Sequence, residues 1–368
     1  MKIIRISLHG LELPFREGAY RCRNHTEYGQ TATIVRIDTD EGITGWGEIA
    51  PLGAFYSEAF TGGVRAGLER LAPMLLDADP RETGKLARTM DAAMHGQVDV
   101  KSPLDIALWD ISARAAGLPL AEHLGGRDGR SVALYRPVSQ ASPEIMLDSA
   151  RRHVAEGYRR LQVKVGDDPV LDATRLQTVA DDFGSSVVIF CDANGAWTSY
   201  DALRFVERTR GIDYVLEQPC RTLDENLVVR RHAAIPMVLD ESADSLEALL
   251  RIHRDGMADG ITIKISRFGG ITRARRIRDL AVDLGLMVTV ECVGGADIAS
   301  AAIAHMSLST PETMRLHTVD FHNWTTVSNA TGLPDVSGGV MRAPSGPGLG
   351  VTPRDDVIGE ALFSCHAS

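Results

Sequence analysis

The chain has 368 residues, of which 44% are hydrophobic and 24% charged, as expected for a folded protein with one large domain and a smaller one. Its formal net charge of −10 argues against nucleic acid or an anionic membrane as a partner. No apolar run approaches the roughly 20 residues that cross a bilayer, and the start lacks the apolar core of a signal peptide. The five cysteines are scattered without CxxC spacing, so we expect reduced thiols in a cytoplasmic protein.

Residues 1–118 predict an α+β capping domain that precedes the main domain. Strands are expected at residues 1–13 and 31–49, and helices at residues 58–76, 81–94 and 102–116. Ser102 is expected to cap the last of these helices, with Pro103 in its first turn. The polar loop between the first two strands is expected to close over a pocket.

Residues 119–330 alternate short apolar stretches with helical patterns. Five of the stretches end in a charged residue, namely Lys164, Asp192, Glu217, Asp240 and Lys264. These residues are 23 to 28 positions apart, the length of one strand, one helix and two loops. The pattern predicts a (β/α)8-type barrel, or its (β/α)7β variant, with its chemistry at the carboxyl ends of the strands. Residues 331–368 are expected to return and pack on the capping domain.

Strand geometry adds the relative positions of these five side chains. Side chains alternate across a strand, so Lys164 shares the inner face with Gln162. If the stretch at Tyr135 is the first strand, Lys164 lies on the second and Lys264 on the sixth, diametrically opposite in a barrel of eight. The three acids lie on the strands in between. The sequence therefore predicts an acidic cluster on one wall with an amine on either side.

Asp192, Glu217 and Asp240 offer oxygen ligands only, which favours Mg²⁺. Ion pairs with basic neighbours are the alternative, but three like charges repel strongly in low dielectric unless a cation joins them. A buried lysine beside a divalent cation shifts toward its neutral form. It can then take a proton from the carbon next to a carboxylate, through a metal-stabilised enediolate.

Several motifs resemble the mandelate racemase and muconate-lactonizing branch of the enolase superfamily. They are KVG at 164–166, DAN-x-x-W at 192–197, EQP at 217–219, LDES at 239–242, KISRFGG at 264–270, GWGE at 45–48, DIALWD at 105–110 and PGLG at 347–350. The resemblance implies that Lys164 and Lys264 are catalytic and that the three acids bind Mg²⁺. A lysine base combined with Mg²⁺ is the established chemistry of that superfamily.

Within this branch, the sequence most resembles the cis-3-hydroxy-L-proline dehydratases, followed by the proline-betaine and hydroxyproline epimerases. The similar stretches are VALYRPVSQASPEIM, GYRRLQVKVG, VLEQPC and STPETMRLHTVDF. As in that group, Gln162 replaces the first lysine of a K-x-K element. After the seventh strand the group has E-D-T-W-G-G-D-I, whereas this chain has ECVGGADI at 291–298, without that acid and that aromatic residue.

Six residues are expected to contact the substrate: Tyr28, Gln162, Asn194, Glu291, Cys292 and Asp320. Asp297 is expected to cap the helix that follows the seventh strand.

The resemblance implies a Mg²⁺-dependent dehydratase of cis-3-hydroxy-L-proline, or of a similar 2-amino-3-hydroxy acid, that forms a cyclic imine. A racemase or epimerase of proline, hydroxyproline or betaine derivatives would use the same residues, since one lysine can take the proton and the opposite one return it. An acid-sugar dehydratase, a non-catalytic ligand-binding relative and a metal-free Schiff-base aldolase are further alternatives. We expect a small carboxylate substrate and a homo-oligomer.

Overall fold

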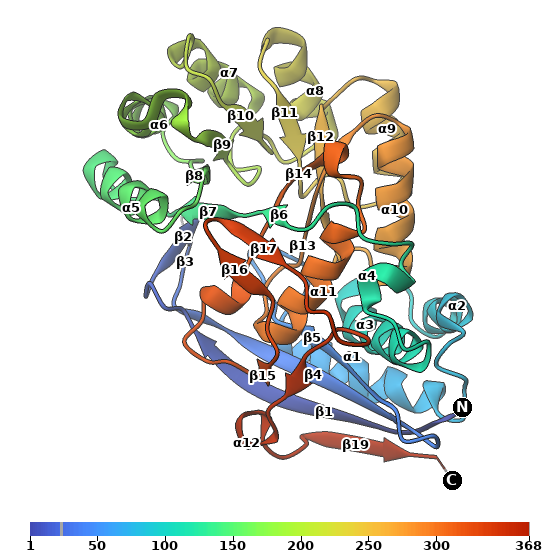
Figure 1. Ribbon diagram of the computed structural model, residues 1–368. Helices are drawn as coiled ribbons and strands as arrows, with labels where there is room; N and C mark the ends of the chain where they lie inside the picture. The colour runs from blue at the N-terminus through green and yellow to red at the C-terminus, as the bar shows by residue number, and fades with distance from the viewer. Residues whose placement is uncertain (23–24, 368) are drawn as a thin grey trace.

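The computed structural model describes residues 1–22 and 25–367, and it contains an eight-stranded parallel barrel (Figure 1). The barrel strands are β7 (Tyr135–Val138), β8 (Arg160–Lys164), β9 (Val188–Asp192), β10 (Val215–Glu217), β11 (Met237–Leu239), β12 (Gly260–Lys264), β13 (Met287–Glu291) and β14 (Arg315–Thr318). Each strand pairs with the next along the chain, and a bridge between Leu134 and Thr318 joins the two ends of the sheet. The predicted barrel is confirmed.

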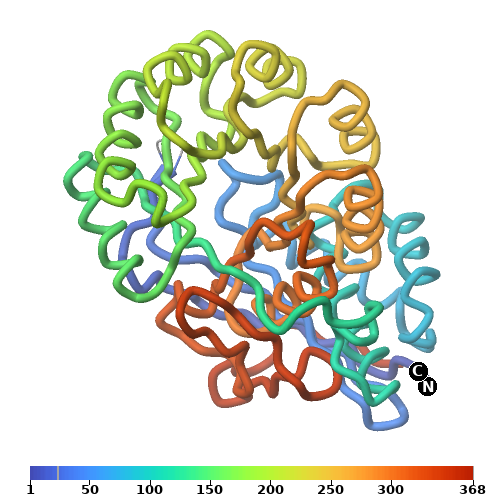
Figure 2. The backbone as a smooth tube through the Cα atoms, turned by 45° about the horizontal axis from the view of Figure 1, so that its top comes forward, coloured from blue at the N-terminus to red at the C-terminus, as the bar shows by residue number. Residues whose placement is uncertain are grey.

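Seven helices follow the first seven strands and surround the barrel (Figure 2). They are α5 (Pro143–Ala155), α6 (Pro169–Phe183), α7 (Ser199–Arg208), α8 (Leu223–His232), α9 (Leu246–Arg254), α10 (Ile271–Asp283) and α11 (Asp297–Leu308). Only the short 3₁₀ helix η4 (Phe321–Asn323) follows β14, so the described residues form the (β/α)7β variant.

The alternation along β8 explains how one strand serves both the core and the site. Leu161 and Val163 are fully buried and pack in one apolar cluster with residues of the surrounding helices, such as Leu176 and Phe205. The side chains of Gln162 and Lys164 lie on the opposite face of the strand and line the cavity inside the barrel.

The N-terminal part of the chain forms a sheet with the strand order β19-β1-β4-β5, covered by helices. Its strands are β1 (Ile3–Pro14), β4 (Gly29–Thr39), β5 (Thr44–Ile49) and β19 (Phe363–His366), and a hairpin of β2 (Tyr20–Cys22) and β3 (His25–Glu27) lies between β1 and β4 in sequence. Its helices are α1 (Thr61–Leu71), η1 (Ala72–Leu75), α2 (Thr83–Ala93) and α3 (Val98–Ala115), and α4 (Leu120–His123) leads to the barrel. The division into domains at residues 118 and 330 stays a prediction.

The C-terminal segment adds short elements. They are β15 (Ala330–Thr331) paired with β18 (Thr352–Pro353), β16 (Asp335–Ser337) and β17 (Val340–Arg342) joined to β6 (Val132–Ala133), and α12 (Asp355–Ile358). Two short 3₁₀ turns belong to the barrel instead: η2 (Gly184–Ser186) after α6 and η3 (Glu312–Met314) before β14. The final strand, β19, pairs antiparallel with β1.

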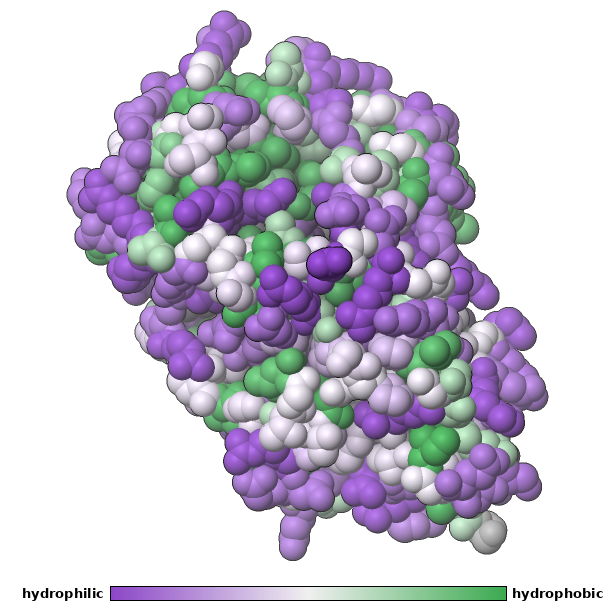
Figure 3. Space-filling model, viewed as in Figure 1, coloured by the Kyte–Doolittle hydropathy of each residue, from purple (hydrophilic) through white to green (hydrophobic). Residues whose placement is uncertain are grey.

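No helix in the described part of the chain is long and apolar enough to span a membrane. Hydrophilic residues are spread over the whole face drawn in Figure 3, with smaller hydrophobic areas between them.

The predicted start of α3 is wrong. The helix begins at Val98, so Ser102 is buried inside it and Pro103 lies in its interior. Val100 packs closely against Gly67 of α1, where an added Cβ would lie only 2.6 Å from a Val100 methyl group. This tertiary contact stabilises an additional helical turn that the local sequence does not predict.

Five of the seven barrel helices cap their own N-termini. The side chains of Ser142, Asp168, Thr198, Thr222 and Ser245 each accept a hydrogen bond from the first turn of α5, α6, α7, α8 and α9, respectively. The N-cap positions of α10 and α11 are Gly270 and Ala296, which have no side chain for this purpose. These two helix ends need acceptors from elsewhere.

For α10, the acceptor is Asp105 of α3. Its carboxylate accepts from the backbone NH of Thr272 at 2.8 Å and from the Thr272 hydroxyl at 2.6 Å. Gly270 has a φ of +114°, and a Cβ there would clash with the Asp105 side chain. Glycine at the N-cap is therefore required by the close approach of this carboxylate as well as by the backbone.

For α11, the acceptor is Glu48 of β5, so the prediction that Asp297 caps this helix is wrong. Glu48 accepts from the backbone NH groups of Ala296 and Ala299, both at 2.8 Å, and from Asn329 Nδ2 at 3.0 Å. Asp297 instead accepts from Ser328 and from the backbone NH of Ala330. Burial raises the pKa of both Glu48 and Asp105 to about 7.

We predict that Glu48→Ala lowers the free energy of unfolding by about 2–4 kcal/mol, because three buried donors lose their acceptor. Urea denaturation measures this change. Glu12→Ala, which removes an exposed glutamate of β1, is the control and should change stability by at most about 0.5 kcal/mol. Equal effects of the two substitutions would contradict the capping role.

Glu48 should also make stability depend on pH. Its pKa in the folded protein lies above the ordinary value of 4.5, so its contribution is lost as pH rises from 4.5 to about 7. Between pH 4.5 and 7, the free energy of unfolding of the wild type should fall by about 3 kcal/mol relative to that of Glu48→Gln, because glutamine cannot ionise at this position. Asp105 titrates in both proteins and cancels in the comparison. Urea denaturation measures both proteins across this pH range. If the difference between their free energies of unfolding does not change with pH, the prediction is wrong.

Candidate active site

A cavity with an empty volume of about 450 Å³ lies at the carboxyl ends of the barrel strands, under side chains of the N-terminal region. It is lined by Phe15, Tyr20, Gln30, Leu52, Tyr56, Tyr135, Gln162, Lys164, Asp192, Asn194, Asp240, Lys264, Glu291, Cys292, Val293, Phe321 and Trp324. Both predicted lysines and two of the three predicted metal ligands therefore face one enclosed space.

Lys164 is buried at the end of β8 and pairs with the neighbouring strand. It lies opposite Asp192 in the β8–β9 register, and its Nζ donates to Asp192 Oδ2 at 2.6 Å and to Asn194 Oδ1 at 3.3 Å. Burial disfavours the ammonium form, but the Asp192 carboxylate outweighs burial and holds the Lys164 pKa well above its usual value. The Tyr20 ring covers this amine at 5.9 Å.

Lys264 is buried at the end of β12, four strands further along the barrel order. Its Nζ lies 2.8 Å from Glu291 Oε1 and 3.1 Å from Asp240 Oδ2. Glu291 is itself fixed by the Tyr135 hydroxyl, which donates to Oε2 at 2.7 Å. Burial is again outweighed by these carboxylates, so the Lys264 pKa is raised.

Glu217 lies deepest among the predicted ligands. It is paired with Asp192 in the β9–β10 register and accepts from Gln162 Nε2 at 2.8 Å and Thr262 Oγ1 at 3.3 Å. Burial, followed by the nearby charges of Asp192 and Asp240, raises its pKa well above the ordinary value. The three acids thus influence one another strongly.

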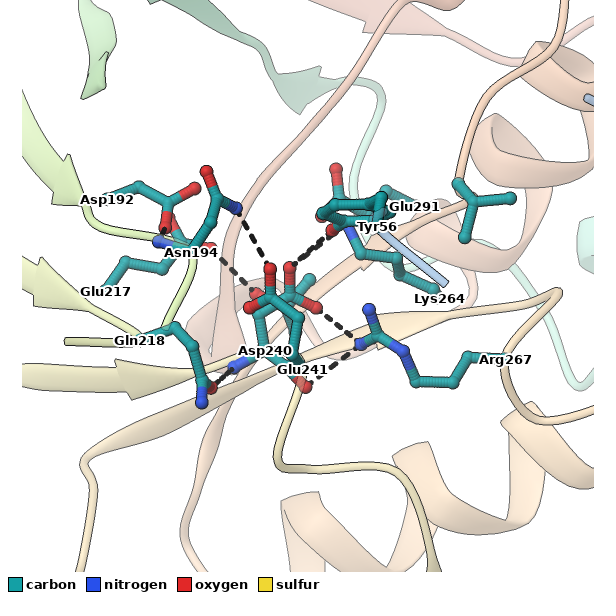
Figure 4. Close-up of polar contacts among 12 residues, drawn as sticks. Tyr56, Asp192, Asn194, Glu217, Gln218, Asp240, Glu241, Lys264, Arg267 and Glu291 are labelled. Atoms are coloured by element: carbon teal, nitrogen blue, oxygen red, sulfur yellow. Dashed lines mark hydrogen bonds and ion pairs between the residues drawn. The ribbon is translucent and has the colours of Figure 1, made fainter. Parts of the chain in front are cut away.

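Asp240 lies between two cationic side chains, as Figure 4 shows. Arg267 Nη1 lies 2.5 Å from Oδ1, and the Tyr56 hydroxyl donates to Oδ2 at 3.1 Å. Burial opposes ionisation of Asp240, but Arg267 and Lys264 lower its pKa to about 2. The carboxylate is therefore available as an anion at all physiological pH values.

A fourth acid, Glu241, follows Asp240, and the sequence analysis did not single it out as a site residue. Its Oε1 accepts from Asn194 Nδ2 at 3.0 Å, whereas its buried Oε2 has no hydrogen-bond partner among the described residues. Burial and the charges of Asp240 and Asp192 raise its pKa to about 7. Its position directly after Asp240 was the sequence feature that could have identified Glu241 as a site residue.

The residues present fit a divalent cation. Within residues 1–22 and 25–367, no three His, Cys, Asp or Glu side chains converge closely enough to coordinate an ion, because the acids are turned toward the amines. The cluster nevertheless holds five carboxylates against three cationic side chains: Asp192, Glu217, Asp240, Glu241 and Glu291 against Lys164, Lys264 and Arg267. When all five acids are ionised, they exceed the three cations by two negative charges, which one Mg²⁺ ion would balance, and the donors are all oxygens.

Four of the six expected substrate contacts, Gln162, Asn194, Glu291 and Cys292, line the cavity. Tyr28 and Asp320 are not among its described lining residues. Tyr28 is 68% exposed and lies between β3 and β4. Asp320 is buried, but its carboxylate accepts from Tyr158 at 2.8 Å and Asn323 at 2.9 Å outside the cavity.

Most of the lining that the sequence analysis did not assign to the site is aromatic. Tyr56 and Tyr135 contact the Lys264 network, and Phe15 and Trp324 pack on either side of Tyr20 at ring distances of 6.2 and 5.9 Å. These residues lie in loops or on other strands far away in sequence. No spacing rule links them to the charged residues at the strand ends.

The chain is similar to known proteins over nearly its whole length. The profile of the mandelate racemase / muconate lactonizing enzyme N-terminal domain matches residues 16–125, and the enolase C-terminal domain-like profile matches residues 145–357. A cis-3-hydroxy-L-proline dehydratase of Roseibium aggregatum is 42% identical, with 98% of this chain and 99% of that protein covered. An L-Ala-D/L-Glu epimerase of Bacillus subtilis is 30% identical, with 99% and 98% covered.

Solved structures show the same architecture. A mandelate racemase/muconate lactonizing enzyme from Roseovarius nubinhibens superposes with a TM-score of 0.96 at 38% identity, covering 100% of this chain and 99% of that one. A structure from the same organism, complexed with magnesium, gives a TM-score of 0.96 at 37% identity, covering 99% and 100%. The chain therefore belongs to the mandelate racemase and muconate-lactonizing branch of the enolase superfamily.

Proposed function

We propose that this protein is a Mg²⁺-dependent dehydratase of cis-3-hydroxy-L-proline or a similar 2-amino-3-hydroxy acid. The observation that carries the proposal is the presence of two buried lysines, on β8 and β12, in one cavity, with the three predicted metal ligands at the ends of the strands between them. The 42% identity to a cis-3-hydroxy-L-proline dehydratase over nearly the full chain supports dehydration as the reaction.

Asp192, Glu217 and Asp240 would hold the ion, in line with the excess of carboxylates and with the magnesium in the related structure. When bound, Mg²⁺ supplies positive charge that stabilises the negative charge developing on the substrate carboxylate. Glu241, with its unpartnered Oε2, is positioned to support this ion or a water beside it.

The two lysines would carry the protons. One of them, in its neutral form, takes the proton from the carbon next to the carboxylate, which requires that a cation offset the carboxylates now holding it as an ammonium. The other, as an ammonium, gives a proton to the departing β-hydroxyl group, which leaves as water. The resulting enamine tautomerises to the cyclic imine, so the net change is the loss of one water.

The aromatic lining supports an amine-bearing substrate. Tyr20 and Trp324 both line the cavity, and aromatic rings attract a cationic amine through their faces. They offer an aromatic surface although this chain lacks the aromatic residue that the resembled dehydratases carry after the seventh strand. An acid sugar carries no cation for these rings, which makes an acid-sugar dehydratase the weaker candidate.

Epimerisation is the second candidate. Lysines on both sides of the cavity suit a reaction in which one removes the proton and the other returns it from the opposite face. Relatives named as racemases and epimerases support it, among them the N-succinyl-L-Arg/Lys racemase of Bacillus cereus, 28% identical over 84% of this chain and 85% of that protein. The homo-oligomer stays a prediction.

The first test is incubation of the protein with Mg²⁺ and cis-3-hydroxy-L-proline in D₂O. Dehydration predicts loss of water and a cyclic imine, whereas epimerisation predicts deuterium at the α-carbon without loss of water, and either outcome is read by NMR and mass spectrometry. Lys164→Ala and Lys264→Ala should each lower turnover by at least about 10²-fold. Lys85→Ala, on an exposed face of α2, is the control and should keep full activity. Full activity in either active-site variant would reject its assigned role.

The metal assignment has its own test. Asp240→Asn removes one anionic ligand, so the Mg²⁺ affinity measured by isothermal titration calorimetry should fall by about 10- to 100-fold. Asp244→Asn alters an exposed acid of the same loop and should leave the titration unchanged. An unaltered Mg²⁺ titration of Asp240→Asn would count against ligation at this position.

A further inference from the structure

The wall of the cavity next to Lys264 is built jointly by two distant parts of the chain. Glu291, Cys292 and Val293 supply it from the end of β13, and Gln30 supplies it from the start of β4. Gln30 is only 6% exposed, although β4 begins just after the β2–β3 hairpin. Its burial and its place in the lining indicate a specific role in the site.

The Gln30 amide binds the backbone of the loop between β13 and α11. Its Nε2 donates to the carbonyl of Val293 at 3.3 Å, and its Oε1 accepts from the backbone NH of Gly295 at 3.2 Å. The Val293 NH in turn donates to Ser266 at 3.3 Å. Any movement of the loop backbone at Val293–Gly295 would therefore break a hydrogen bond to Gln30 or to Ser266.

Gly294 lies between the two backbone groups that Gln30 holds. A Cβ at this position would clash with both terminal atoms of the Gln30 side chain and would lie 2.5 Å from the carbonyl oxygen of Ala50. The carbonyl belongs to the backbone and cannot move aside easily. As long as Gln30 stays in place, residue 294 can carry no side chain toward the cavity, and the glutamine provides the volume there instead.

We propose that Gln30 is a specificity-determining residue of the site. Its two hydrogen bonds position Val293–Gly295 as the wall beside Lys264, and its side-chain volume limits the bulk that a substrate can carry on that side. The choice of probe molecules rests on the proposed function, whereas the role of Gln30 in shaping the wall does not depend on it.

Two substitutions separate volume from hydrogen bonding. Gln30→Ala removes both, and Gln30→Met keeps a similar volume but makes no such hydrogen bonds. Gln140→Ala is the matched control, because Gln140 is equally buried at 8% exposure but is not among the described residues that line the cavity. Gln30→Met also keeps the proposal testable if Gln30→Ala does not fold.

The probes are cis-3-hydroxy-L-proline and derivatives with one extra methyl group on nitrogen or on a ring carbon. In Gln30→Ala, kcat/KM for at least one methylated derivative should rise about tenfold relative to the parent compound, since one added methyl group is worth roughly that much in a tight pocket. In Gln30→Met, KM should rise several-fold for all probes while their ratios stay as in wild type. Unchanged ratios and KM in Gln30→Ala would overturn the proposal.

A separate readout needs no ligand. Hydrogen exchange of the backbone amides from Val293 to Ala296 should speed up in both Gln30 variants and stay unchanged in Gln140→Ala. If wild type releases no water from cis-3-hydroxy-L-proline, the proposed function fails, and the same probes are compared by their Kd values in the presence of Mg²⁺. Gln30 keeps its assigned role only if a methylated probe then binds better to Gln30→Ala than to wild type, and any other result overturns it.

Discussion

The active site depends on two buried carboxylates that cross from the N-terminal region to the barrel. Asp105 and Glu48 supply the acceptors that the N-termini of α10 and α11 lack. Unsatisfied NH groups at a buried helix end cost free energy, so these two helices are complete only when the N-terminal region is docked. Both helices directly follow the strands that end in Lys264 and Glu291. Docking of the N-terminal region on the barrel therefore stabilises the half of the site that contains Lys264 and Glu291.

Charge balance inside the cavity explains why such an arrangement tolerates so many ionisable groups. Each lysine is neutralised by a neighbour on the adjacent strand, and Arg267 adds a third cation beside Asp240. Glu217 and Glu241 remain without a cation of their own, and both have raised pKa values. A cluster with two acids in excess is poised to take up a divalent cation, which would also release the lysines from their present role as counter-ions.

The N-terminal region also determines the shape of the space in which a substrate would lie. Tyr20 and Tyr56 cover the two lysines, and Gln30 fixes the loop after β13. The barrel strands carry the charged side chains of the cavity, whereas these three side chains come from segments outside the barrel. The charged groups and the side chains that shape the space around them thus come from different parts of the fold, as is common for barrels.

The sequence by itself determined the barrel and the strand-end positions of Lys164, Lys264 and the three acids, because strand periodicity and repeat length are local properties that charged residues at strand ends make visible. The family followed from the resemblance of short motifs around these residues. Only the tertiary structure decided which groups those side chains meet. Ser102 was misassigned as a cap because packing against α1, which is distant in sequence, extends α3 back to Val98. Asp297 was misassigned because the acceptor for α11, Glu48, also lies far away in sequence. Tyr56, Tyr135 and Gln30 went unassigned for the same physical reason: contacts between distant segments follow from packing, which no local pattern records.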